Sequence, residues 1–290
     1  MAENENLKEG RKEVKLLKPK NDFVFQSLFN QNNEKITKAF VQALLDEKIQ
    51  KIVINDDKEL FREKPEDKLG ILDLQLDIND NEKVDVEIQL IDREDFVQRI
   101  LFYLSRLYQA QVKRGKDYSD AKRVVLIAIL DYNLELTKEI KEIETKWNLL
   151  EKNHPKLELT NLIEIRILEL EKVKEYYRVN KNNKKTQWLM FLNEPNSKEV
   201  KEIMEENEDI KDAVIEVHKM SEDEKMQRLE FLKEKAIMDE RSSYRTGLHK
   251  GEKNKTIEIA QKLYEMNLSI EKIMQATGLS KEELEKILKC

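Results

Sequence analysis

Apolar residues near the start of the chain recur at helical spacing. Between residues 21 and 45 an apolar side chain returns every three or four positions, which predicts two short helices. These apolar positions are Phe25, Leu28, Phe29, Ile36, Phe40, Leu44 and Leu45. Residues 1–18 show little periodicity of this kind, so we expect a flexible leader there.

A group of β-type runs follows these helices. Residues 49–56, 68–78 and 82–91 are rich in β-branched and other apolar residues and are bounded by charged or Asn/Asp segments, which predicts three strands. Residues 93–114 have the spacing of a long amphipathic helix. The continuous apolar run at 123–130 is typical of a strand that is buried on both faces.

The second half of the chain is predicted to be mostly helical. We expect a charged helical segment from residue 131 to about Pro155, one alternating strand at 160–170, and helices from there to the end. The expected organisation is a leader at 1–18, an α/β core at 19–175, a helical extension at 176–256 and three short helices at 257–290.

Composition narrows the possible chemistry. The single cysteine, Cys290, excludes disulfides within the chain and cysteine-rich metal sites. The three histidines are far apart in sequence, and neither a Gly-x-Ser-x-Gly motif nor a phosphate-cradling glycine loop occurs. Catalysis would therefore rest on carboxylates, amides and a hard cation such as Mg²⁺, with no small-molecule cofactor.

Charge and hydropathy indicate where the protein works. Charged residues make up 39% of the chain, and only 6 glycines and 4 prolines occur in 290 residues, so helices should dominate. No apolar run is long enough for a membrane span, and the N-terminus is too acidic and polar for a signal peptide. We expect a cytoplasmic protein that does not contact membranes.

The two strands at 71–90 carry an unusual polar face. In the first, Leu72, Leu74 and Leu76 alternate with polar residues, and the second has the same pattern. The polar positions are Asp73, Gln75, Asp77, Asp85, Glu87 and Gln89. A turn at 79–81 makes facing residue numbers sum to 160, so Asp73 faces Glu87, close enough for the two carboxylates to share one metal ion.

Charge is concentrated on this hairpin. Residues 73–92 hold seven acidic residues and one basic residue, a net charge of −6 that equals the net charge of the whole chain. Facing carboxylates repel each other unless a cation neutralises them, which favours a metal site. The alternative is an ordinary solvated hairpin face, which antiparallel sheets tolerate.

The following segment has the opposite charge. Residues 93–123 hold eight basic and four acidic residues, a net charge of +4. Arg99, Tyr103 and Arg106 lie at i, i+4 and i+7 on one helix face, where they could hold and stack against a nucleic acid. The alternative is a core helix whose arginines are simply exposed.

The last helices allow two interpretations. Residues 277–280 could be the turn of a helix-turn-helix, but the final helix, 281–289, has three acidic and three basic residues and attracts phosphates poorly. Short helices of this kind also gain stability from a partner. We therefore favour self-association into a homodimer, with sequence-specific DNA binding as the alternative.

Several motifs together resemble a known family. They are Lys20-Asn21-Asp22-Phe23, ILDLQL, VEIQL, RILFYLSRLYQAQVKRGKDY at 99–118, WLMFL at 188–192 and the closing LSIEKIMQATGLSKEELEKIL. Their order resembles the Rpn family of recombination-promoting nucleases, also called PD-(D/E)XK nuclease family transposases. The resemblance implies a restriction-endonuclease-like α/β core with a mostly helical C-terminal half.

The resemblance also implies roles for particular residues. Asp73 and Glu87 would hold a divalent cation, Mg²⁺ or in vitro Mn²⁺ or Ca²⁺, and Gln89 would replace the usual lysine beside the attacking water. The implied function is Mg²⁺-dependent DNA endonuclease activity in recombination, mobile elements or phage defence. The alternatives are an inactive DNA-binding or regulatory protein that keeps the fold, and a helical interaction scaffold.

Overall fold

The protein is described here from a computed structural model. The described residues are 14–55, 73–112, 115 and 117–288. They form two compact units, Met1–Lys233 and Glu234–Cys290, each taken by itself below.

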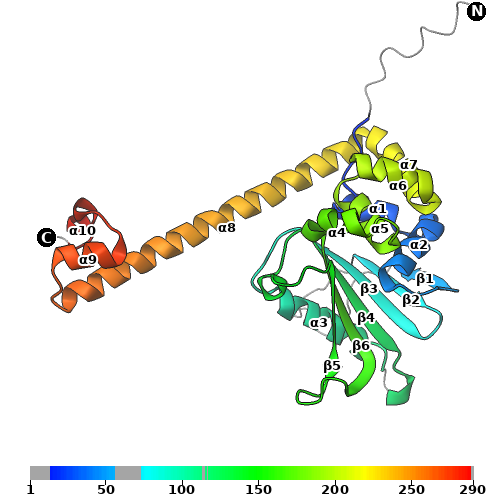
Figure 1. Ribbon diagram of the computed structural model, residues 1–290, viewed down its shortest axis with the longest axis horizontal. Helices are drawn as coiled ribbons and strands as arrows, with labels where there is room; N and C mark the ends of the chain where they lie inside the picture. Colours follow the sequence, from blue (N-terminus) through cyan, green and yellow to red (C-terminus); the bar gives the residue numbers. More distant parts are fainter. Residues whose placement is uncertain (1–13, 56–72, 113–114, 116, 289–290) are drawn as a thin grey trace, which may run out of the picture. The chain divides into compact units, whose positions relative to one another are not determined.

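The first unit is built on a six-stranded sheet in the order β1-β2-β3-β4-β6-β5 (Figure 1). The strands are β1 (Ile52–Asn55), β2 (Leu74–Ile78), β3 (Glu82–Gln89), β4 (Arg123–Leu130), β5 (Glu144–Leu150) and β6 (Glu158–Glu169). Strands β3, β4 and β6 are parallel, and the outer pairs are antiparallel. The central strand β4 is buried on both faces, which explains its continuous apolar sequence. The predicted α/β class is confirmed.

The segment from 131 to about 155 was predicted to be helical, and that prediction is wrong. It contains one 3₁₀ turn, Glu135–Thr137, followed by strand β5. This edge strand is largely exposed, so its sequence carries little apolar alternation. Its backbone hydrogen bonds come from β6, a partner that local sequence spacing does not reveal.

A cluster of helices shares its hydrophobic core with one face of the sheet. They are α1 (Asp22–Leu28), α2 (Glu34–Leu45), α4 (Val173–Val179), α5 (Lys184–Asn193), α6 (Lys198–Glu206) and α7 (Glu208–Glu222), with 3₁₀ turns at Gln31–Asn33 and Leu170–Lys172. At their centre the rings of Phe29 and Phe40 stack at 4.2 Å, and Trp188 of α5 lies 5.4 Å from Phe40. The boundary expected after residue 175 therefore does not separate compact units, because α5 and α7 share the core with α2.

The leader prediction needs a correction in its described part. Residues 1–13 lie outside the described residues. Leu17, however, is buried in the core, and its backbone N–H donates a hydrogen bond to Ser221 Oγ at 2.9 Å. Leu17 is thus packed against α7 and does not belong to a flexible leader.

Among the described elements, one helix packs on the opposite face of the sheet. Helix α3 (Phe96–Gln109) packs along β4, and a 3₁₀ turn at Tyr118–Asp120 precedes that strand (Figure 1). The helix buries the apolar side chains Phe96, Ile100, Leu104 and Leu107 against Val124, Leu126, Ala128 and Leu130. Any polar side chain of β3 on this face therefore lies beside an apolar layer.

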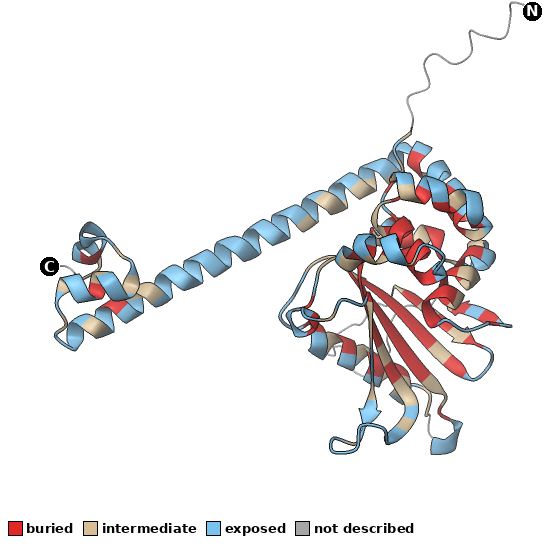
Figure 2. Cartoon of the chain, in the orientation of Figure 1, coloured by how far each residue is buried: buried red, intermediate tan, exposed pale blue. Residues whose placement is uncertain are grey.

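The second unit begins within helix α8 (Glu224–Glu265) and ends with α9 (Ile270–Thr277) and α10 (Lys281–Leu288). Ala260, Ile273 and Leu284 form a small buried cluster, whereas most of α8 is exposed (Figure 2). The last two predicted helices are confirmed. The helix predicted to start at 257 is instead the end of α8.

Helix α10 begins with a capping box, since the Ser280 backbone N–H donates to Glu283 at 2.9 Å. None of the described helices is both long and apolar enough to cross a membrane.

Candidate functional site

The β2–β3 hairpin has the register that the sequence predicts. Each facing pair, from Leu74 and Val86 to Ile78 and Glu82, has residue numbers that sum to 160. The turn that sets this register has positive φ angles at Asn79 and Asp80, 50° and 63°, which these residue types tolerate. The hairpin therefore brings its polar side chains to one face of the sheet.

Asp73 and Glu87 are held together just beyond the last strand pair. The backbone N–H of Asp73 donates to Glu87 Oε1 at 3.3 Å, and the backbone N–H of Ile88 donates to Asp73 Oδ2 at 2.8 Å. The predicted juxtaposition of these two carboxylates is thus present.

The polar face is not solvated as a simple hairpin would be. Asp85 is 0% exposed and Glu87 is 2% exposed. The parallel register with β4 places them beside Leu126 and Ala128, in the layer that α3 covers. The alternative of an exposed hairpin face is therefore wrong at these two positions, because they lie in the layer that α3 buries against β4.

Burial and crowding change the acidity of these carboxyls. Burial raises the pKa of Asp85 well above its usual value, and the negative charge of Asp73 adds to the rise. Burial likewise raises the pKa of Glu87, and the charges of Asp85 and Asp73 raise it further. Arg99 on α3 opposes the rise in the Glu87 pKa, so its guanidinium acts on this site.

Asp85 and Asp77 lie on the same face of the sheet but have different surroundings. Asp77 accepts hydrogen bonds from Lys83 Nζ at 2.7 Å and Asn55 Nδ2 at 3.0 Å, and these bonds lower its pKa despite burial. Neither oxygen of Asp85 has a hydrogen-bond donor within the described part of the chain. The Glu87 carboxyl beside it can donate only when it carries a proton itself.

Gln89 lies at the exposed end of this group. It is half-buried, and its Nε2 atom is 3.5 Å from Glu87 Oε2, which is too long for a strong hydrogen bond. Its backbone carbonyl accepts from Asp131, the residue that follows β4, at 2.9 Å. The predicted position of Gln89 beside Glu87 is present, while its role in catalysis stays a prediction.

A lysine near this edge was not singled out from the sequence. Lys20 Nζ lies 2.5 Å from Asp131 Oδ1 and 2.8 Å from Asn193 Oδ1. Lys20 was part of the family-like motif, but nothing in local spacing links it to Asp131, which is 111 residues away. The fold therefore brings a positive charge to the carboxyl-terminal ends of β3 and β4.

The three residues predicted to contact nucleic acid share one face of α3. Arg99 donates to the Tyr103 hydroxyl at 3.3 Å, and its guanidinium lies 5.9 Å from the centre of that ring. The guanidinium of Arg106 lies 6.0 Å from the Phe102 ring. All four side chains are partly exposed, so this face of α3 is accessible beside the carboxylates.

Among the residues that the structure describes, no three His, Cys, Asp or Glu side chains converge closely enough to hold a metal ion as they stand. The donor set nevertheless fits a hard cation. Asp73, Asp85 and Glu87 offer only carboxylate oxygens, and the two buried oxygens of Asp85 lack partners. Oxygen ligands of this kind suit Mg²⁺.

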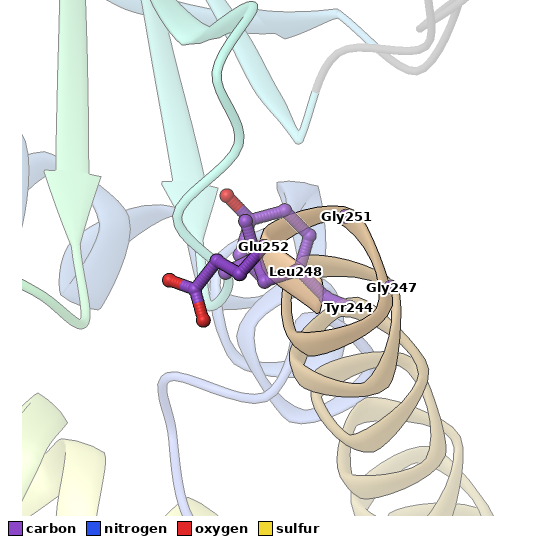
Figure 3. A pocket seen from close by; sticks show the side chains of 5 residues that line it. All are labelled: Tyr244, Gly247, Leu248, Gly251 and Glu252. Carbon is purple, nitrogen blue, oxygen red and sulfur yellow. The ribbon is translucent and has the colours of Figure 1, made fainter. Parts of the chain in front are cut away.

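A shallow pocket on α8 is chemically different. Tyr244, Leu248 and Glu252 lie at successive i+4 positions beside Gly247 and Gly251 (Figure 3). The missing side chains of the two glycines create the hollow, and one carboxylate lines it. This pocket contains no pair of acidic groups and does not compete with the hairpin as a catalytic site.

Comparison with known proteins identifies a family. A family model described as PD-(D/E)XK nuclease family transposase matches residues 19–247. No curated protein and no solved structure gives a significant match to the chain.

Proposed function

The chain belongs to the PD-(D/E)XK nuclease family transposases, and we propose that it is a Mg²⁺-dependent endonuclease that hydrolyses DNA phosphodiester bonds. The observation that carries this proposal is the contact between Asp73 and Glu87 on a buried, acidic face of the sheet. Buried carboxylates that raise one another's pKa are unfavourable unless a cation compensates them.

Asp73 and Glu87 would hold the divalent cation. When bound, such a cation lowers the pKa of a coordinated water and offsets the negative charge that develops on the phosphate. The two hydrogen bonds that join Asp73 to the end of β3 fix the position of its carboxylate before substrate arrives. Less reorganisation is then needed when the reaction begins.

Gln89 would position the attacking water or the scissile phosphate rather than activate the water. Its amide can donate to the scissile phosphate or hold the attacking water, but it has no positive charge and accepts no proton as a base. Lys20, held by Asp131 just after the neighbouring strand β4, brings a nearby positive charge that Gln89 lacks.

The face of α3 would bind the DNA backbone. Arg99 and Arg106 can contact phosphates, and Tyr103 can stack or donate a hydrogen bond. Because Arg99 already interacts electrostatically with Glu87, a strand bound along this face would pass close to the acidic group.

Cleavage of both strands would suit a homodimer. Two single-cation sites related by a two-fold axis can address the antiparallel backbones of a duplex. We place the activity in recombination, mobile elements or phage defence, as expected from the family.

Plasmid cleavage by the purified protein tests the proposal. We expect nicked or linear DNA with Mg²⁺, no cleavage in EDTA, and no cleavage by Asp73→Ala or Glu87→Ala. Asp77→Asn is the matched control, because it changes a carboxyl on the same face that is already paired with Lys83. Cation-dependent cleavage by either alanine variant would contradict the assignment. Tight DNA binding without cleavage by the wild-type protein would favour the inactive DNA-binding alternative.

A further inference from the structure

Asp85 has the most unusual environment of the hairpin carboxyls. It lies in the middle of β3, between Gln75 of β2 and Leu126 of β4 in the strand register. Its side chain is fully buried, and neither oxygen accepts a hydrogen bond from any described residue. A carboxylate that is buried without a partner is strongly destabilising in general.

The neighbouring cations do not compensate Asp85. Lys83, two residues earlier on the same face, lies 2.7 Å from Asp77 instead. Arg99 acts on Glu87 and donates to Tyr103. Of the side chains that act on Asp85, Asp73 contributes a negative charge, and Glu87 can share a proton with it.

The three carboxyls are nevertheless neighbours. Asp85 and Glu87 are two residues apart on one strand face, and Asp73 is hydrogen-bonded to Glu87. They do not meet at one point, which is the arrangement that mutual repulsion favours. A cation among them would offset the repulsion and would supply the partner that the Asp85 oxygens lack.

We propose that Asp85 is a third carboxylate ligand of the divalent-cation site, beside Asp73 and Glu87. This inference rests on the proposed function, which assigns a cation to Asp73 and Glu87. It would add a carboxylate from the buried part of the group to the two already proposed. A rival explanation is that Asp85 stays neutral and shares a proton with Glu87.

Cation binding, measured separately from cleavage, distinguishes these explanations. Calorimetry with Ca²⁺, and thermal melts with Ca²⁺ or Mg²⁺ against EDTA, are recorded for the wild-type protein, Asp85→Asn and Asp77→Asn. We expect Asp85→Asn to weaken Ca²⁺ affinity by about tenfold or more and to lose most of the cation-induced rise in melting temperature. Asp77→Asn should behave like the wild type.

The metal-free melts add a second readout. Asp85→Asn should melt higher than the wild type in EDTA, because an amide replaces a crowded carboxylate of the same shape. If Asp85→Asn does not fold, Asp85→Ser removes the carboxylate with a smaller side chain, and the same calorimetric comparison decides.

The outcomes separate this inference from the proposed function. Wild-type Ca²⁺ affinity in a folded Asp85 variant overturns the inference, even if the wild-type protein cleaves DNA. Reduced affinity in the Asp85 variant with no cleavage by the wild type supports the inference and overturns the nuclease proposal. Failure of the wild-type protein to bind any divalent cation overturns both.

Discussion

The backbone N–H of Asp73 donates a hydrogen bond to Oε1 of its cross-strand neighbour Glu87 at 3.3 Å. In return, the Asp73 carboxylate accepts the backbone N–H of Ile88 at 2.8 Å. Asp73 lies outside the last residue pair of the strand ladder, so these bonds, not the ladder, set its position. The same carboxyl is therefore both a structural acceptor and a proposed ligand.

Substitution of Asp73 can separate these two roles. Asp73→Asn keeps an acceptor for Ile88 but removes the charge, so we expect unchanged or higher stability in EDTA and cleavage reduced by about a hundredfold. Asp73→Ala removes both the acceptor and the charge, and it should melt at a lower temperature than Asp73→Asn. Melting curves and plasmid cleavage check this, and an Asn variant that cleaves as fast as the wild type would contradict it.

A charge at position 89 should stabilise the protein when no divalent cation is present. Gln89→Lys places an ammonium beside Glu87 and offsets the crowded carboxylates, so we expect a gain of about 1 kcal/mol in EDTA. Chemical denaturation measures the difference. Gln89→Met is the matched control, since it has similar length and no charge, and an equal gain in both variants would show that packing is responsible.

The arginines of α3 should contribute to DNA binding through phosphates. We expect Arg106→Ala to weaken binding to all sequences alike and to lower the log–log salt slope by about one, with the same effect for Arg99→Ala. Lys138→Ala, an exposed lysine paired with Glu135, is the control. Unchanged affinity and slope together with a lower melting temperature would assign these arginines a structural role instead.

Arg166 is a buried side chain on the face of the sheet opposite the acidic group. It is 3% exposed, donates to the carbonyl oxygens of Leu44 and Leu45 at 3.2 and 3.0 Å, and pairs with Glu164. Arg166→Met leaves a buried carboxylate and two carbonyls with fewer partners, so we expect a loss of about 3 kcal/mol in urea unfolding. Its strand neighbour Lys146 is exposed, and Lys146→Met should change stability by less than about 0.5 kcal/mol.

The C-terminal helices should support self-association. We expect the full chain to be a dimer by light scattering and a chain ending at Lys255 to be a monomer. Ala260, Ile273 and Leu284 already pack within one chain, which leaves exposed side chains such as Met266, 69% exposed, for a second copy. Met266→Lys should weaken the dimer without unfolding the unit.

Two results would contradict that expectation. One is a monomeric full-length chain. The other is a truncated chain that stays dimeric but loses preference for particular DNA sequences, which would favour a helix-turn-helix role for α9 and α10.

Local sequence determined the hairpin and much of the site. The alternation in β2 and β3 and the turn at 79–81 fix the register, because one buried face and a short loop allow a single pairing. Continued by one pair beyond the ladder, that register predicts Asp73 opposite Glu87, and two hydrogen bonds then hold Asp73 there. Helices α1, α2 and α3 follow equally from apolar spacing.

The pattern of apolar and polar residues did not determine strand β5 or the burial of Asp85, because both depend on tertiary contacts. β5 is a strand because β6 supplies its hydrogen bonds, and Asp85 is buried because α3 covers the strand face on which it lies. Asp77 and Asp85 look equivalent in the sequence, yet only the first of these two carboxyls accepts hydrogen bonds from described residues. The charge balance of a side chain depends on which partners the fold brings to it, and periodicity carries no information about them.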